Sequence, residues 1–154
     1  MAMLNPYNYK KPKNAMKAKQ GNKKHLHAVK NETTSKKDQY LEQKIMAARP
    51  EQLTLMLYEG LVRFLKQGKL FMSGGKENIQ KVHNSLLRAQ AIMNELRSTL
   101  DMEIDISENL DALYEYMIRR TVEANIDKDQ EILDEVVGLA EELRDTWQEA
   151  MEKL

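Results

Sequence analysis

The sequence contains no cysteine among its 154 residues. This absence excludes disulfides, thiolate nucleophiles and cysteine-based zinc sites, and it fits a reducing compartment. No apolar run approaches the roughly 20 residues that a membrane span requires. The lysine-rich N-terminus is also not followed by the apolar segment of a secretory signal. We therefore expect a cytoplasmic protein that does not insert stably into membranes.

Charge is unevenly distributed along a chain whose formal net charge is zero. Residues 1–38 hold ten lysines and two acidic residues, a net charge of +8, so the remainder carries −8. Residues 1–38 also mix asparagine, proline and glycine with apolar residues of no clear period, which is typical of a flexible arm. Arginines and a row of stacking aromatics are missing, which favours a solubilising tail over a nucleic-acid-binding arm. The sequence thus predicts a flexible lysine-rich arm over 1–38 and a helical bundle over 39–154.

From Tyr40 onward, apolar residues recur with the period of an α-helix in four long segments. A short helix in KDQYLEQKIMAA is expected to precede them, and no strand is predicted. Four amphipathic helices with short connections predict an all-α fold, an antiparallel four-helix bundle. The expected segments are 50–71, about 77–100, one starting at Ser107, and one starting at the capping-box-like pair Asp127 and Gln130.

Residues that support catalysis or metal binding are scarce. Only three histidines occur, His25, His27 and His83, and none follows a glutamate by three residues. Because di-metal sites in helical bundles use Glu-x-x-His on two helices, we expect no metal and no cofactor. A nucleophile elbow and a glycine-rich phosphate loop are also missing, so we expect no enzymatic activity.

One histidine is a candidate phosphoryl acceptor. His83, in KVHNSLLRAQ, resembles locally the acceptor of histidine phosphotransfer domains. Those domains place a lysine and then a glycine shortly after the histidine, whereas Leu86 and Leu87 stand here. A partly exposed histidine beside the core is the favoured interpretation. A generic helical adaptor whose basic arm binds an acidic surface is the other alternative.

The first long segment is more apolar than one buried helix face requires. In LTLMLYEGLVRFLKQ, residues 53–67, the apolar side chains cover an arc on the order of 200°, against a little over 100° for one buried face. Either this helix touches two neighbours, or part of its surface forms a groove for a partner segment. Ten methionines suit such a groove, because their side chains adapt to varied shapes. Gly60 and Gly68 predict the close approach of another backbone.

Four runs of the helical part form a specific pattern: ARPEQLTLMLYEGLVRFL, RAQAIMNELRSTLD, LDALYEYMIRRTVEANI and LRDTWQEAM. In this order, and together with the opening MAMLNPY, they resemble the flagellar secretion chaperone FliS family. The resemblance covers about residues 40–151. It implies a helical bundle without enzymatic activity that binds the disordered C-terminal segment of flagellin in the cytoplasm. Binding would prevent premature polymerisation and help to deliver flagellin to the export gate protein.

The resemblance also implies residues of the partner-binding site. A tyrosine and an aliphatic residue before the first long helix are implicated in the family's client site or its cover. Tyr40 and Ile45 match these two positions. The expected site residues are Tyr40, Ile45, Leu53, Leu57, Tyr58, Leu61, Tyr114, Tyr116, Met117 and Arg120.

Two features depart from the family pattern. Family members commonly carry serine or threonine before the proline of the first long helix, whereas Arg49 stands here and has no acceptor for a cap. A lysine-rich stretch of 32 residues, 8–39, also separates the NPY opening from Tyr40, and it is longer than the family usually carries. As a hypothesis, this added segment folds over the vacant groove or attracts acidic partners.

Overall fold

The computed structural model describes residues 4–9 and 36–153. The predicted flexible stretch between them, from residue 10 to residue 35, lies outside the described residues. None of the helices in the described part is long and apolar enough to cross a membrane. In chain order, the elements are α1 (Lys36–Ala47), α2 (Pro50–Met72), the 3₁₀ turn η1 (Gly75–Asn78), α3 (Ile79–Ser98), α4 (Asp105–Asp127) and α5 (Gln130–Glu152).

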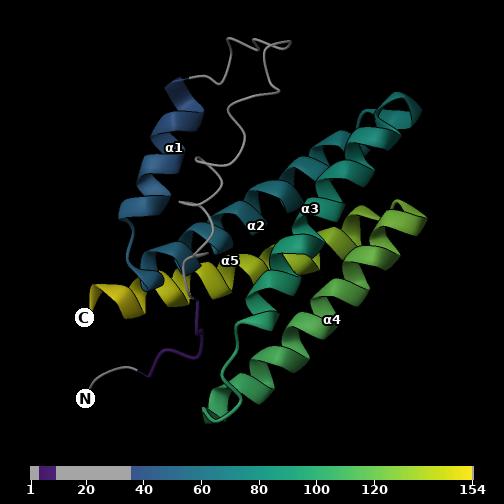
Figure 1. Cartoon of the computed structure of the whole chain (residues 1–154). Coiled ribbons are helices and arrows are strands. Elements are labelled where there is room, and N and C mark those ends of the chain that lie inside the picture. The colour runs from purple at the N-terminus through teal and green to yellow at the C-terminus, as the bar shows by residue number, and fades with distance from the viewer. Residues whose placement is uncertain (1–3, 10–35, 154) are drawn as a thin grey trace, which may run out of the picture.

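Helices α2 to α5 form an antiparallel four-helix bundle (Figure 1). Helix α2 packs against α3 and α5, and α4 packs against the same two helices on the opposite side. This arrangement confirms the predicted all-α bundle. Helix α1 leans away from the bundle and has no buried residue (Figure 1).

The wide apolar arc of α2 contains residues buried in the core and residues at the edge of the core. Tyr58, Leu61 and Leu65 are buried, because α2 faces both α3 and α5. Leu57 and Phe64 are only partly buried and lie at the edge of the core. The largest fully buried side chains of the core are Tyr58, Tyr114, Leu61, Leu65, Leu86, Met93, Leu96, Met117, Leu133, Val82, Val136 and Thr54.

At the start of α2, the side chain of Gln52, and not that of Arg49, makes the hydrogen bond of the cap. The side-chain oxygen of Gln52 accepts a hydrogen bond from the backbone N–H of Arg49, at 2.9 Å. The Arg49 side chain has only donors and cannot accept a bond from the helix N-terminus. Only the reciprocal half of a capping box is therefore present, with Pro50 at the first helical positions.

The predicted start of the last helix is wrong by two residues. Asp127 is the last residue of α4, and Lys128 follows it in the left-handed conformation with φ of 53°. Asp129 is the residue that caps α5, since its carboxylate accepts from the backbone N–H groups of Glu131 and Ile132. The left-handed residue ends α4 between the two aspartates, so only the second one is free to cap.

Part of the predicted N-terminal arm is packed against the bundle. Residues 4–9, which we call the N-terminal strap, run beside the α3–α4 loop. The N–H of Asn8 donates to the carbonyl of Thr99 at 2.7 Å, and the N–H of Asp101 donates to Pro6 at 2.8 Å. Two backbone hydrogen bonds thus fix the strap, and the expectation of a flexible arm does not hold for these six residues.

Tyr7 anchors the strap in the core, where only 3% of the residue is exposed. Its ring packs edge-to-face against Tyr58 and Trp147, with centroids 6.0 and 5.4 Å away. Its hydroxyl is hydrogen-bonded to the hydroxyls of Tyr58 and Tyr114, which are 2.8 Å from each other. Burial raises the pKa of all three hydroxyls in this tyrosine cluster, Tyr7, Tyr58 and Tyr114.

The glycines of α2 mark close side chains and not, as predicted, a close backbone. A Cβ at Gly68 would lie 2.6 Å from Cδ2 of Leu86, and one at Gly60 would lie 3.3 Å from Cδ1 of Ile92. Both neighbours belong to α3. The tight packing of α2 on α3 therefore depends on Gly68 most directly.

Two glycine substitutions are expected to change stability in opposite directions. Gly68→Ala forces buried Leu86 to move and should lower the free energy of unfolding by about 1–2 kcal/mol. Gly138→Ala, in α5, meets nothing within 4 Å and should raise it by about 0.5–1 kcal/mol. Urea unfolding followed by the fluorescence of Trp147, the only tryptophan, measures both. Equal effects of the two substitutions would contradict the packing described for Gly68.

Candidate functional site

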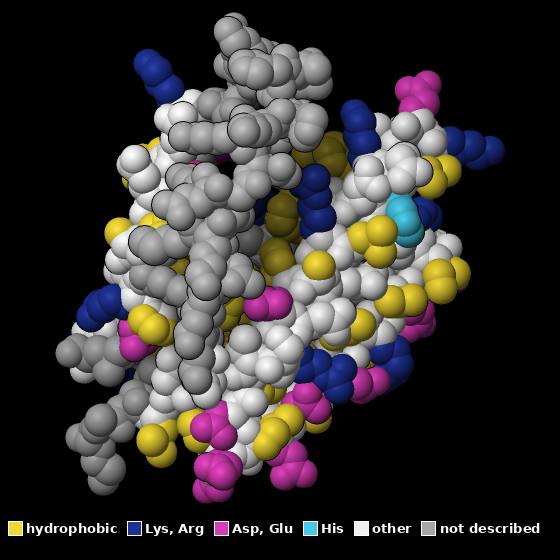
Figure 2. Space-filling view, in the orientation of Figure 1, with side chains coloured by type: hydrophobic (Ala, Val, Ile, Leu, Met, Phe, Trp, Pro, Cys, Tyr) yellow, Lys and Arg dark blue, Asp and Glu magenta, His cyan; other side chains and the backbone are white. Residues whose placement is uncertain are grey.

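An apolar cleft of about 350 Å³ lies between α1 and the outer faces of α2 and α3. We call it the α1–α2 trough. Figure 2 shows apolar side chains in the hollow beside α2 and basic side chains near its edge. The residues that line the trough are Tyr9, Leu41, Lys44, Ile45, Leu53, Met56, Leu57, Glu59, Gly60, Arg63, Phe64 and Ile92.

A second hollow, of about 330 Å³, adjoins the trough at the α1–α2 connection. The two share Lys44, Met56 and Glu59 as lining residues. The side chain of Met56 is partly exposed and is not part of the core cluster. Ala47, Ala48, Gln52 and Leu55 complete the lining of the second hollow. The two cavities thus lie next to each other along one side of α2, with Met56 as their shared apolar residue.

Helix α1 supplies the outer wall of the trough without packing into the core. Its apolar residues are exposed, Tyr40 at 68%, Leu41 at 48% and Ile45 at 38%. An isolated helix of 12 residues is only marginally stable in water. The helical conformation of α1 therefore depends on contacts between its apolar residues and other segments.

The structure brings three of the ten expected site residues into the trough and places a fourth on its wall. Ile45, Leu53 and Leu57 line the cleft. Tyr40 is exposed on α1, but it does not line the cleft. Four others, Tyr58, Leu61, Tyr114 and Met117, are buried at 2% exposure or less and form the core. No surface remains on these four residues for a partner.

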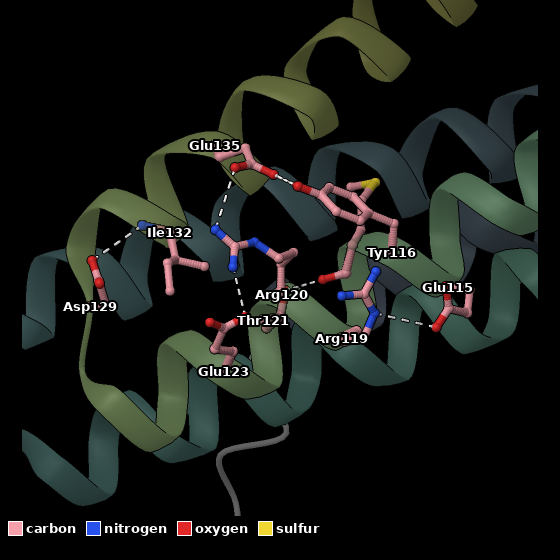
Figure 3. Close-up of polar contacts among 10 residues, drawn as sticks. Glu115, Tyr116, Arg119, Arg120, Thr121, Glu123, Asp129, Ile132 and Glu135 are labelled. Atoms are coloured by element: carbon pink, nitrogen blue, oxygen red, sulfur yellow. Dashed lines mark hydrogen bonds and ion pairs between the residues drawn. The ribbon is translucent and has the colours of Figure 1, made fainter.

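The remaining two expected residues, Tyr116 and Arg120, lie on another face of the bundle. Figure 3 shows both on α4, pointing toward Glu135 of α5. The Tyr116 hydroxyl donates to Glu135, and Arg120 contacts Glu123 at 2.7 Å and Glu135 at 3.6 Å. The hydrogen bond to Glu135 raises the pKa of Tyr116, and the one to Glu123 raises that of Arg120. The contacts with Glu135 join α4 to α5, the contact with Glu123 lies within α4, and none of them reaches the trough.

His83 is held in a polar contact between two helices. Asn125 of α4 lies with its side-chain nitrogen 3.0 Å from Nδ1 of His83, which belongs to α3. Lys128 donates to the side-chain oxygen of the same Asn125 at 2.6 Å. This bond turns the Asn125 nitrogen toward His83, so Nδ1 accepts. The geometry favours a structural role for His83. Within the described residues, no cluster of three or more His, Asp or Glu side chains can hold a metal ion.

Comparison with protein families identifies a match over the whole helical part. The family model described as "Flagellar protein FliS" matches residues 33–154. The flagellar secretion chaperone FliS of Bacillus subtilis is 35% identical over 113 residues, which cover 73% of this chain and 84% of that protein. The FliS of Escherichia coli is 36% identical over 114 residues, covering 72% and 82%.

A solved structure shows the same fold. The crystal structure of a bacterial flagellar chaperone superposes with a TM-score of 0.62 at 19% sequence identity. The superposition covers 77% of this chain and 99% of that one.

Proposed function

This chain belongs to the FliS family of flagellar secretion chaperones, and from that premise we propose that its α1–α2 trough binds the C-terminal segment of flagellin. The segment is held in the cytoplasm until it is passed to the flagellar export gate protein. The action is binding, without covalent chemistry.

The observation that supports this site most strongly is the apolar surface left open beside the core. Leu41 and Ile45 of α1 face Met56, Leu57 and Phe64 across the trough. Exposed apolar surfaces of this kind on a soluble domain mark docking sites. A disordered segment that folds on binding can lay apolar anchors into such a groove.

The proposed effect on flagellin follows from mass action. When the apolar anchors of the segment are buried in the trough, they are not available for contacts between flagellin molecules. The concentration of assembly-competent flagellin falls by the fraction that is bound. The bound complex is also the form that we expect the export gate protein to receive.

Calorimetric titration with a flagellin C-terminal segment tests the proposal. We expect saturable binding with a negative heat-capacity change, because apolar surface is removed from water. In parallel, light scattering should show that an equimolar amount of the chaperone suppresses flagellin polymerisation. The proposed function is wrong if the segment does not bind, or if polymerisation proceeds unchanged when it does.

A further inference from the structure

Charge divides the helices into two halves of opposite sign. Helices α4 and α5 together carry three basic and 14 acidic residues, a net charge of −11. Helices α1, α2 and α3 carry nine basic and five acidic residues, a net charge of +4. The trough is lined by residues of the second group and the N-terminal strap, so it opens on the basic half of the molecule.

The cations of the basic half differ in whether they already have a carboxylate partner. Lys66 of α2 reaches Glu141 of α5 at 3.2 Å, and Arg97 of α3 reaches Asp111 of α4 at 2.6 Å. Arg63 and Arg88, by contrast, form no ion pair or hydrogen bond among the described residues. Both side chains are exposed. Their charge is therefore available to an external anion.

One aromatic ring holds these two arginines together. The guanidinium carbon of Arg63 lies 5.0 Å from the ring centroid of Phe64, and that of Arg88 lies 5.4 Å from the same centroid. Arg63 comes from α2 and Arg88 from α3, so the ring gathers two cations from neighbouring helices. A guanidinium stacked on a ring keeps its N–H edges free for carboxylate oxygens. Phe64 itself lines the trough beside Leu57 and Ile92.

We propose that Arg63 and Arg88 form a carboxylate-binding end of the trough, and that the bound segment carries an Asp or Glu next to an apolar anchor. This inference rests on the proposed function and adds the chemistry by which the client is recognised. The anchor fills the apolar cleft beside Leu57, and the acidic side chain pairs with the two guanidinium groups. A flexible acidic peptide fits better than a nucleic acid, because the −11 charge of α4 and α5 repels a long polyanion.

The double variant Arg63→Gln/Arg88→Gln tests the carboxylate-binding end. Glutamine keeps part of the aliphatic stem and removes the charge. Affinity for the flagellin C-terminal segment should fall about tenfold at low salt, the sum of two partly exposed ion pairs. Binding should also become less sensitive to salt than in the unsubstituted protein. The matched control is Lys66→Gln/Lys69→Gln on α2, whose lysines are paired with Glu141 and Asp134. The control should bind with unchanged affinity.

Substitutions in the client locate the partner of the arginines. Each Asp and Glu of the segment is replaced singly by Asn or Gln. One of these changes should weaken binding to the unsubstituted chaperone and have little further effect on the double variant. Thermal unfolding verifies that both chaperone variants remain folded.

The outcomes separate this inference from the proposed function. If the unsubstituted chaperone does not bind the segment, the proposed function fails and the inference fails with it. If it binds but the double variant binds equally well and with the same salt dependence, only the inference is overturned. Displacement of the segment by a 12-nucleotide single-stranded RNA would also overturn it, in favour of a nucleic-acid site.

Discussion

Between pH 10 and pH 11, the free energy of unfolding is expected to fall by about 2 kcal/mol, which is about 1 kcal/mol each for Tyr7 and Tyr114. Burial raises the pKa of Tyr7, Tyr58 and Tyr114 above the ordinary value of 10. The unfolded chain therefore releases these protons in a range where the folded chain retains them. Stability from the cluster is complete below pH 10 and is lost as the pH rises above it. A loss of this size is a large part of the total stability of a small domain.

Urea unfolding at pH 8, 9, 10 and 11 measures this loss. Trp147 is a suitable reporter because it packs against Tyr7 and Tyr58. Tyr114→Phe removes one of the two strongly shifted groups and should reduce the alkaline loss by about half. Unchanged stability up to pH 11 would contradict the buried position of the cluster, and with it the docking of the N-terminal strap.

Met56→Asp is expected to weaken binding of the flagellin C-terminal segment by about 30-fold or more. Met56 lines both the trough and the adjoining hollow. The substitution removes the apolar contact of Met56, and the new carboxylate must be desolvated when the segment docks. Together these effects should lower the binding free energy by about 2 kcal/mol or more. Because Met56 is not part of the core cluster, the stability of the free chaperone should change little.

Val122→Asp is the matched control for Met56→Asp. Val122 is also an exposed apolar residue, 38% accessible, but it lies on α4, which does not line the trough. Its substitution should leave the affinity unchanged. Calorimetry with the same segment measures both variants. If both weaken binding equally, or if only Val122→Asp does, the client lies on another face of the bundle.

The fold could be predicted from the sequence because helical periodicity is local. The apolar pattern within each long helix, about 20 residues, indicates which face is buried. Pro50 indicates where α2 begins. The local sequence predicts a start of α5 at Asp127, because it does not show that Lys128 adopts the left-handed conformation. The position of Tyr7 could not be derived from a pattern either. It depends on contacts with Tyr58, Tyr114 and Trp147, which are distant in sequence.

The site could be predicted only in part, for a related reason. The surplus apolar arc of α2 indicated a second surface, and Leu53 and Leu57 lie on it. Which neighbouring positions face inward depends on how α2 meets α3 and α5, so Tyr58 and Leu61 were not separable from the surface residues. Residues of the trough that were not predicted include Leu41, Phe64 and Ile92. Of these, Phe64 was within the apolar stretch, whereas Ile92 reaches the trough only through the packing of α3.

The contacts of Tyr116 and Arg120 could not be predicted from the sequence of α4 alone. Their pairing with Glu135 joins two helices, and nothing in the local sequence of α4 predicts which acidic residue of α5 is near. We propose that the client site comprises the trough residues of α1, α2 and α3, with Tyr40 on the outer wall. The α4 residues stabilise the opposite side of the bundle.

The most direct test of the account is to ask which face of the chaperone touches flagellin. Because the chain has no cysteine, a single one can be introduced and labelled with a benzophenone photocross-linker. A label at Leu41→Cys, on the wall of the trough, should cross-link to the flagellin C-terminal segment, and excess unlabelled segment should abolish the product. A label at Val122→Cys should give none. Cross-linking from position 122 but not from position 41, with binding intact, would contradict the claim that the trough holds the client.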